Sequence, residues 1–383
     1  GVQIVPPFDA EIAAAIEAAP PADEIPMNDD LVEAVDPREE YVAEAVTLAS
    51  GEADARADLR IVLTAMHGVG AAMTARVLAE AGFAKVSLVA AQAEPDPDFP
   101  TVPFPNPEEA GALDMAIEQA RAEDADLIIA VDPDADRCAL AVPDPHAEAE
   151  WTPLSGDQIG CLLGEFLASR GLRGSLANSI VSSRLLARIA RSHGLEHHTT
   201  LTGFKWIARA PQLAFGYEEA IGFCPNPSAA RDKDGIASSV VAASLFAALK
   251  TEGRTAWDEL DRLAHAHGLH VTGPLTFRVE EIAQIATGMA RLRAQPPSEL
   301  AGSPVVEVSD LAEGYQGLPP TDGILVLTEA GDRVIARPSG TEPKLKCYLE
   351  VILPAPEGEP VPWEAARERL ELIKREFGQI IGL

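Results

Sequence analysis

Short apolar runs alternate along most of the chain with longer segments that have helical spacing. Runs rich in Val, Ile and Leu are typical of buried strands, and apolar positions three and four residues apart are typical of helices. The runs that predict strands lie at residues 61–63, 86–89, 127–131 and 175–181. The segments that predict helices lie at about residues 8–19, 37–50, 71–81, 108–121, 156–169, 183–193 and 234–250. This alternation predicts two consecutive α/β domains with parallel sheets.

The pattern changes after about residue 270. Four strand-like runs follow, at about residues 275–279, 323–327, 333–336 and 346–352, and two helices fit around them, at about residues 279–292 and 363–377. Strands that follow one another with few helices between them predict an α+β domain with an antiparallel sheet. We therefore expect a short N-terminal stretch at 1–40, α/β domains at 41–155 and 156–270, and an α+β domain at 271–383.

Composition and charge argue against several classes of protein. The 383 residues are enough for two or three domains at about 150 residues each. A formal net charge of −30 opposes general binding to nucleic acid or to anionic membranes. Hydrophobic residues make up 47%, yet no apolar run approaches the length of about 18 residues that a membrane span needs. The four cysteines have no paired spacing, so we expect neither disulfides nor a zinc site, and we expect a cytoplasmic protein.

Three aspartates at alternate positions follow a predicted buried strand directly. Asp132, Asp134 and Asp136 could converge on a hard cation such as magnesium, which takes oxygen ligands. An EF-hand is excluded, because its loop needs Gly at the sixth position and Glu at the twelfth, where this chain has Arg137 and Pro143. The alternative is a solvated acidic turn, but the carboxyl end of a parallel strand is where α/β proteins bind ligands. Arg137 could contact a phosphate or pair with an aspartate of this loop.

The segment at residues 337–346 could bind an anion. It holds three cations within ten residues of a very acidic chain. Arg337 can bind a phosphate through two hydrogen bonds, and Ser339, Gly340 and Thr341 offer hydroxyl and backbone donors. The alternative is an ordinary polar turn.

Other candidate residues are weak when taken singly. Glu218 and Glu219 lie between two glycines and could present a carboxylate to sugar hydroxyls. Lys205 and Lys233 could bind phosphate or transfer a proton, because the pKa of a lysine shifts when its site is desolvated. Each is more commonly a solvated surface residue. The Gly-rich segment at 67–70 lacks both the dinucleotide fingerprint and the Walker lysine, and we interpret it as a tight structural turn.

Together and in this order, the segments resemble the α-D-phosphohexomutase family, which includes phosphoglucomutases, phosphomannomutases and related phosphopentomutases. Asp-Pro-Asp-Ala-Asp-Arg at 132–137 resembles the family's magnesium loop, and Gly-Tyr-Glu-Glu-Ala-Ile-Gly at 216–222 its sugar-recognition loop. Arg-Pro-Ser-Gly-Thr-Glu at 337–342 resembles its phosphate-binding loop, and Thr-Gly-Phe-Lys at 202–205 is a fourth match. The resemblance covers nearly the whole chain. It implies four domains around a deep cleft, and residues 1–7 resemble the end of the first domain.

The resemblance implies a magnesium-dependent mutase that interconverts hexose 1-phosphates and 6-phosphates, with glucose or mannose as the sugar. Its partners would be small sugar phosphates, and the protein would be a monomer or a homodimer. The site residues it implies are Asp132, Asp134 and Asp136 for magnesium, Lys233 and Arg137 for catalysis, and Thr202, Gly203, Lys205, Glu218, Ala220, Arg337, Ser339, Gly340 and Thr341 for substrate.

Three departures from the family pattern limit this expectation. The phosphorylated serine of a Thr-Ala-Ser-His-Asn-Pro-like loop does not occur in these 383 residues, so we expect the chain on its own to lack mutase turnover. Pro133 stands where many members have Gly, and Ala220 where many hexose enzymes have Ser. Both favour the subgroup that includes phosphopentomutases. The alternatives are therefore a phosphopentomutase and a sugar-phosphate-binding protein without catalysis.

Overall fold

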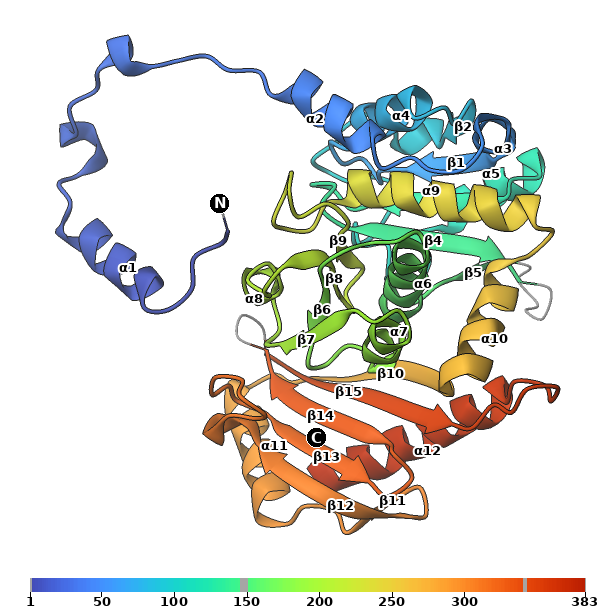
Figure 1. The fold of residues 1–383 in the computed structure, drawn as a ribbon. Coiled ribbons are helices and arrows are strands. Elements are labelled where there is room, and N and C mark those ends of the chain that lie inside the picture. The colour runs from blue at the N-terminus through green and yellow to red at the C-terminus, as the bar shows by residue number, and fades with distance from the viewer. Residues whose placement is uncertain (1, 145–150, 340–342, 383) are drawn as a thin grey trace. The chain divides into compact units, whose positions relative to one another are not determined.

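The computed structural model describes residues 2–144, 151–339 and 343–382, and the chain divides into two compact units (Figure 1). The first unit consists of Gly1–Ala141, Phe204–Arg209 and Gly222–Ala248, and the second of Val142–Gly203, Ala210–Ile221 and Leu249–Leu383. We call these the N-terminal unit and the C-terminal unit. Within the described residues, no helix is long and apolar enough to cross a membrane.

The N-terminal unit is built on three parallel strands. Its strands are β1 (Arg60–Thr64), β2 (Lys85–Leu88), β3 (Leu127–Val131), β4 (Cys138–Pro143) and β9 (Gly222–Cys224). Its helices are α1 (Phe8–Ala18), α2 (Arg38–Val46), α3 (Ala53–Asp58), α4 (Ala71–Glu80), α5 (Asp114–Glu123), α8 (Phe204–Ile207) and α9 (Gly235–Thr251), with short 3₁₀ turns at Ala22–Glu24, Asp29–Leu31 and Ala90–Gln92. The central strand β1 pairs in parallel with β2 and with β3. The sequence predicted these three strands from their apolar runs. In the structure, β1 and β3 are almost wholly buried.

Strand β4 runs antiparallel to β3, which the prediction of a parallel sheet did not include. The loop between them spans only residues 132–137. A parallel connection needs a crossover of about a dozen residues or more, so this short loop can only turn the chain back on itself. The predicted metal loop is therefore the turn of a hairpin.

The C-terminal unit begins with a second parallel arrangement. Its first elements are β5 (Trp151–Pro153), α6 (Gly156–Ser169), β6 (Ser175–Ser179), α7 (Leu185–Ser192), β7 (Glu196–Thr200), β8 (Leu213–Glu218) and α10 (Ala256–His267). Strand β6 pairs in parallel with both β7 and β8. Helix α6 starts with a capping box in which Ser155 and Gln158 satisfy each other's backbone N–H groups.

An antiparallel sheet of six strands, in the order β10-β15-β14-β13-β12-β11, completes the C-terminal unit. The strands are β10 (Leu269–Arg278), β11 (Glu299–Leu300), β12 (Ser303–Asp310), β13 (Ile324–Thr328), β14 (Arg333–Pro338) and β15 (Lys344–Leu353), accompanied by α11 (Ile282–Ala294), α12 (Trp363–Ile381) and a 3₁₀ turn at Leu311–Glu313. Alternate residues of the strands face opposite sides. Val334 packs in the core formed with α11 and α12, whereas Ile335 packs against Ile180 and Val181.

The order of parallel units followed by an antiparallel sheet is the one that the sequence predicted. Helix α5 begins six residues later than expected. The elements that were not predicted are strands β4, β5, β7, β8, β9, β11 and β12 and helices α3, α8 and α10. Strand β7 is a polar edge strand, Glu-His-His-Thr-Thr, with no apolar run to mark it. Helix α10 begins with a capping box between Thr255 and Asp258, and this signal is visible in the sequence. The prediction did not use it, because it treated the histidines at the end of the helix as the start of a new region.

Candidate functional site

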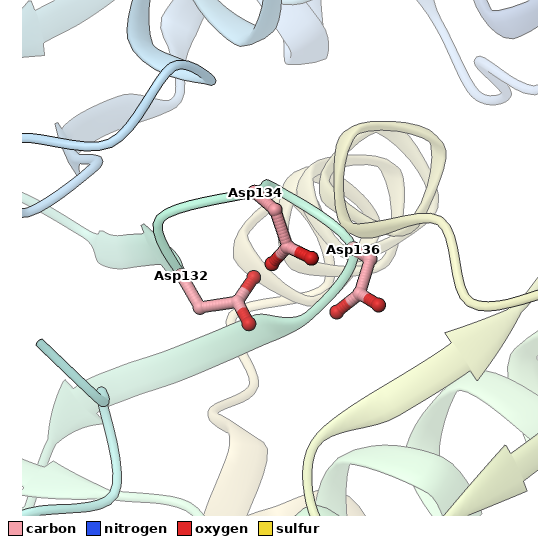
Figure 2. Close-up of side chains that lie close together, drawn as sticks. All are labelled: Asp132, Asp134 and Asp136. Atoms are coloured by element: carbon pink, nitrogen blue, oxygen red, sulfur yellow. The ribbon is translucent and has the colours of Figure 1, made fainter. Parts of the chain in front are cut away.

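The three aspartates of the predicted metal loop converge. Asp132, Asp134 and Asp136 each offer one carboxylate oxygen, and these oxygens all lie within 4.8 Å of one another. Figure 2 shows the three carboxyl groups turned toward a common space beside the loop. Asp132 is buried, Asp134 is exposed and Asp136 is intermediate. The loop therefore presents oxygen ligands of the kind that a hard cation takes.

Backbone contacts fix the shape of this loop. The side chain of Asp132 accepts a hydrogen bond from the backbone N–H of Arg137 at 3.0 Å, and Ala135 adopts a left-handed φ of 60°. Two other segments pack closely against this loop, each through a glycine of its own. A Cβ on Gly68 would lie 2.4 Å from the Cα of Pro133, and a Cβ on Gly235 would lie 2.3 Å from the carbonyl oxygen of Arg137. The turn at 67–70 thus supports the metal loop by close packing.

Two cations only partly offset the negative charge of the aspartates. Lys233 Nζ lies 2.8 Å from Asp136 Oδ2, and Arg137 Nε lies 3.4 Å from Asp132 Oδ2. Burial raises the pKa of Asp132 to about 6, and the charges of Asp136 and Asp134 add to this effect. Asp136 Oδ1 is buried and has no hydrogen-bond partner among the described residues, although Arg137 Nε lies 3.7 Å from it. An oxygen-only donor set with an unsatisfied oxygen and net negative charge fits a divalent cation such as magnesium.

The predicted sugar loop leaves the end of β8 in the C-terminal unit. Glu219 Oε2 accepts hydrogen bonds from Ser179 Oγ at 3.1 Å and Ser182 Oγ at 3.0 Å. Glu218 and Ala220, on either side, are partly buried. Ser179 is the last residue of β6 and Ser182 follows this strand. Neither serine was predicted, because isolated serines at a strand end carry no distinctive pattern. Their contacts fix Glu219 in place.

The predicted phosphate loop begins at Arg337, near the end of β14. Arg337 Nη1 donates a hydrogen bond to Thr202 Oγ1, and Arg337 Nε is buried without a hydrogen-bond partner among the described residues. Ser339 N donates to the carbonyl of Lys344 at 2.8 Å. The fold therefore joins Arg337 to Thr202, two residues that the sequence placed in separate motifs. Gly340 and Thr341 lie outside the described residues.

A partly buried tyrosine, Tyr348, lies within electrostatic range of the predicted sugar loop and of Arg337. Burial raises the pKa of the Tyr348 hydroxyl, and the charges of Glu219 and Glu218 raise it further, while Arg337 lowers it. Tyr348 is on β15, the strand that pairs with β14. The charges of the predicted sugar loop and of Arg337 thus act on the same hydroxyl group in the C-terminal unit.

The predicted site residues are divided between the two units. Those of the N-terminal unit are Asp132, Asp134, Asp136, Arg137, Lys205 and Lys233, and those described in the C-terminal unit are Thr202, Gly203, Glu218, Ala220, Arg337 and Ser339. Lys205 lies on α8, and its carbonyl accepts a hydrogen bond from Arg209 at 2.6 Å. Lys233 lies with its Nζ 5.6 Å from the ring centre of Phe204.

A buried cluster of charges, absent from the sequence predictions, supports the segment that carries Ser182. Glu350 on β15 is fully buried, and its two oxygens accept hydrogen bonds from Ser183, Arg184 and His270 at 2.6 to 2.9 Å. Arg333 Nη2 lies 3.2 Å from Glu350 Oε2. We call these five residues the Glu350 cluster. Burial alone would raise the pKa of Glu350, but Arg333, His270 and Arg184 hold it well below its ordinary value.

Arg333 connects this cluster to the loop after β6. Its guanidinium donates to the carbonyl of Ile180 at 2.8 Å and to that of Ser182 at 2.6 Å. Ser182 in turn donates to Glu219 of the sugar loop. A lone glutamate between Leu349 and Val351 in an apolar strand is the sequence signal that could have pointed to this cluster.

Comparison with known proteins gives matches along most of the chain. Family models described as phosphoglucomutase/phosphomannomutase α/β/α domain II, α/β/α domain III and C-terminal domain match residues 39–145, 155–266 and 275–359. A Haemophilus influenzae protein named "Probable phosphomannomutase" is 44% identical over 358 residues, which cover 91% of this chain and 72% of that protein. A Staphylococcus aureus phosphoglucomutase is 35% identical and is matched over 78% of this chain and 58% of its own length.

A solved structure has the same fold at low sequence identity. The crystal structure of pp63/parafusin, a phosphoglucomutase from Paramecium, superposes with a TM-score of 0.67 at 19% identity, over 92% of this chain and 64% of that one. The resemblance inferred from the four loops is confirmed by the three domain matches and by the Haemophilus relative. The chain therefore belongs to the phosphoglucomutase/phosphomannomutase family, the α-D-phosphohexomutases.

Proposed function

We propose that this chain forms the body of a magnesium-dependent phosphosugar mutase that interconverts hexose 1-phosphates and hexose 6-phosphates, with glucose or mannose as the sugar. The names of its relatives support a mutase of this class. The observation that carries the proposal is the convergence of three carboxylates, one with an unsatisfied buried oxygen, in a chain of this family.

The aspartate loop serves the phosphoryl group that is transferred. A magnesium ion held by Asp132, Asp134 and Asp136 would supply positive charge that offsets the charge of this group. Lys233 Nζ holds Asp136 and is our candidate for proton transfer at the reacting hydroxyl. Arg137 pairs with Asp132 and adds positive charge.

The loops of the C-terminal unit serve recognition. Arg337 donates to the phosphate that is not transferred, together with Ser339 and the loop residues Gly340 and Thr341. Glu218 accepts hydrogen bonds from sugar hydroxyls, and Ala220 bounds the space beside the sugar. Thr202 and Gly203 shape the position of Arg337, because Thr202 accepts its hydrogen bond. Lys205, in the N-terminal unit, adds positive charge for the phosphate.

The phosphoryl donor in this proposal is a phosphoserine that these 383 residues do not contain. Its phosphoryl group passes to the free hydroxyl of the sugar phosphate, which gives a sugar bisphosphate and a serine hydroxyl. Transfer of the other phosphate back to the serine gives the isomeric sugar phosphate. We expect the 383-residue chain on its own to bind sugar phosphates without turning them over.

A calorimetric titration with glucose 1-phosphate, mannose 1-phosphate and glucose 6-phosphate tests this proposal. Arg337→Ala should weaken the binding of all three by a similar factor of about 10 to 100, because a charge-assisted contact of about 1.5–3 kcal/mol is lost. Arg375→Ala, which removes an exposed arginine of α12, is the matched control and should change nothing. Unchanged affinity, or a loss confined to one sugar, would contradict the role of Arg337.

A phosphopentomutase is the second candidate. Ala220 supports it, because this side chain offers no hydroxyl for a hydrogen bond to a hexose. In competition titrations, ribose 1-phosphate should displace glucose 1-phosphate weakly if the hexose assignment is correct. Tighter binding of ribose 1-phosphate would favour the pentose assignment.

A further inference from the structure

A pocket of about 260 Å³ lies in the C-terminal unit, where α6, α10, β10 and α12 meet (Figure 1). Leu260 and Leu370 form part of its apolar wall, and Trp257 and Trp363 form its aromatic wall. The two indole rings are perpendicular, with ring centres 6.1 Å apart. None of the residues that we assign to the metal or to the sugar phosphate lines this pocket. It is therefore a second site.

The aromatic wall offers apolar surface only. The indole N–H of Trp257 donates to the carbonyl of Pro143 at 3.1 Å, and that of Trp363 donates to Asp261 Oδ1 at 2.6 Å. Because both donors are satisfied, an occupant meets ring carbons rather than polar groups. Such a wall favours a flat apolar body.

Two basic residues line the pocket, Arg367 and His270, and His270 is hydrogen-bonded to Glu350. Arg367 is exposed, and its guanidinium carbon lies 5.9 Å from the ring centre of Trp363. It forms no ion pair with any residue that the structure describes, although the chain carries 60 acidic residues. A guanidinium beside an aromatic ring is well suited to bind a carboxylate.

Asp157, the acidic residue that lines the pocket, already accepts hydrogen bonds from other residues. Asp157 Oδ1 accepts hydrogen bonds from the backbone N–H of Ser183 at 2.6 Å and from the hydroxyl of Tyr217 at 2.8 Å. It would repel the charged end of an anionic ligand, so that end belongs at Arg367. The charges thus orient the ligand.

We propose that this pocket binds a small aromatic carboxylate, with its ring against Trp257 and Trp363 and its carboxylate on Arg367. An apolar cavity of about 150 Å³ is large enough for benzene in another protein. A pocket of about 260 Å³ therefore has room for one ring and a short acidic arm. Phenylacetate is the simplest probe with these features.

Occupancy of this pocket is expected to affect the sugar loop. Asp157 lines the pocket and holds the hydroxyl of Tyr217, which directly precedes Glu218. A ligand that shifts Asp157 therefore shifts the start of the sugar loop, and the coupling is reciprocal. This coupling, unlike the binding itself, rests on the proposed function.

Calorimetry on the 383-residue chain tests the binding. Phenylacetate should bind saturably at one site, and the neutral isostere phenylacetamide should bind at least about tenfold more weakly, because it makes no charge-assisted contact. Arg367→Gln should weaken phenylacetate binding by about tenfold. Arg375→Gln, which removes the same charge from an exposed position on the same helix, should leave it unchanged. Absence of saturable binding, or equal losses in the two variants, overturns the proposal.

The indole N–H resonances of the tryptophans test where phenylacetate binds. Phenylacetate should shift the indole N–H resonances of Trp257 and Trp363 and leave that of Trp206, in the N-terminal unit, unchanged. Leu260→Trp, which fills the pocket, should abolish these shifts. Saturable binding that shifts only Trp206, or that survives in a folded Leu260→Trp variant, places the ligand elsewhere and overturns the assignment.

The coupling is measured by titrating glucose 1-phosphate with and without saturating phenylacetate. A change of threefold or more in affinity, which corresponds to about 0.65 kcal/mol, supports the coupling. Phenylacetate binding without such a change confirms the pocket and overturns the coupling. Failure of glucose 1-phosphate to bind at all overturns the proposed function and leaves the result for the pocket standing.

Discussion

The aspartate loop and the Glu350 cluster are both concentrations of charge, but they are balanced differently. In the aspartate loop, three carboxylates lie within 4.8 Å of one another and two cations pair with them, which leaves Asp136 Oδ1 without a hydrogen bond. In the Glu350 cluster, one carboxylate with no exposed side-chain surface is surrounded by two arginines, a histidine and a serine.

This difference distinguishes the proposed metal site from a structural cluster. A buried carboxylate surrounded by cations holds elements in place, and removing one partner leaves the others uncompensated. A group of like charges with incomplete partners is destabilising by itself and becomes favourable only when a ligand of opposite charge arrives. The predictions that follow test this distinction through stability in one region and through ligand affinity in the other.

The largest effect is expected from Glu350→Ala. Arg333 would be left buried without its carboxylate, so the free energy of unfolding should fall by about 3–5 kcal/mol. Unfolding in urea measures this loss. Glu357→Ala, an exposed glutamate of the same unit, is the control and should change stability by less than about 0.5 kcal/mol. Equal effects of the two substitutions would mean that the cluster is not structural.

Asp157→Asn should change how stability depends on pH. Burial raises the pKa of Asp157 from 3.8 to about 6, so the folded state holds this proton more tightly than the unfolded state. The resulting stabilisation is complete below pH 3.8 and is lost as the pH rises through 6. The stability of the variant relative to the unmodified chain should therefore rise between pH 4 and pH 7, by at most about 3 kcal/mol.

Urea unfolding of both proteins across this pH range gives the comparison. Glu357→Gln serves as the exposed control, for which the difference should stay flat. A flat difference for Asp157→Asn as well would show that its carboxyl has an ordinary pKa in the folded chain.

Asp134→Asn should weaken magnesium binding without unfolding the chain. Asp134 is exposed, so its loss leaves the core intact, but it removes one of three charged ligands. Because loss of a group that merely supports a ligand costs about 10- to 100-fold in metal affinity, loss of a ligand should cost at least about tenfold. Calorimetric titration with magnesium measures the affinity, and Asp54→Asn is the exposed control. Equal affinities in all three proteins would show that the metal site is misassigned.

The smallest effect is expected from Lys233→Met. Lys233 Nζ lies 2.8 Å from Asp136 and offsets part of the charge that attracts a cation. Its removal should tighten magnesium binding about three- to fivefold, which corresponds to an ion-pair contribution near 1 kcal/mol. Lys85→Met, which removes the exposed pair with Asp58, should not alter magnesium affinity. Weaker binding in Lys233→Met would mean that the lysine organises the loop rather than competing with the cation.

The sequence predicted those parts of the candidate site whose residues lie close together in the chain. The aspartates lie within five residues of one another, so the sequence alone placed them in one loop, and the apolar strand before them placed that loop at a strand end. The contact between Arg337 and Thr202 spans 135 positions and follows from no local pattern. Polar strands such as β7 were missed for a related reason, because pairing with β6 rather than their own apolarity makes them strands.

The local sequence was enough to predict the succession of α/β units and antiparallel sheet, the family and the residues that could bind a metal. These features depend on apolar periodicity and on short motifs. Both are properties of residues that lie close together in the sequence. The folded arrangement alone shows that Glu350 is paired, that Ser179 and Ser182 fix Glu219, and that a pocket lies beside Arg367. Each of these depends on burial and on partners distant in the chain, and the energy of a charge is set by its surroundings rather than by its place in the sequence.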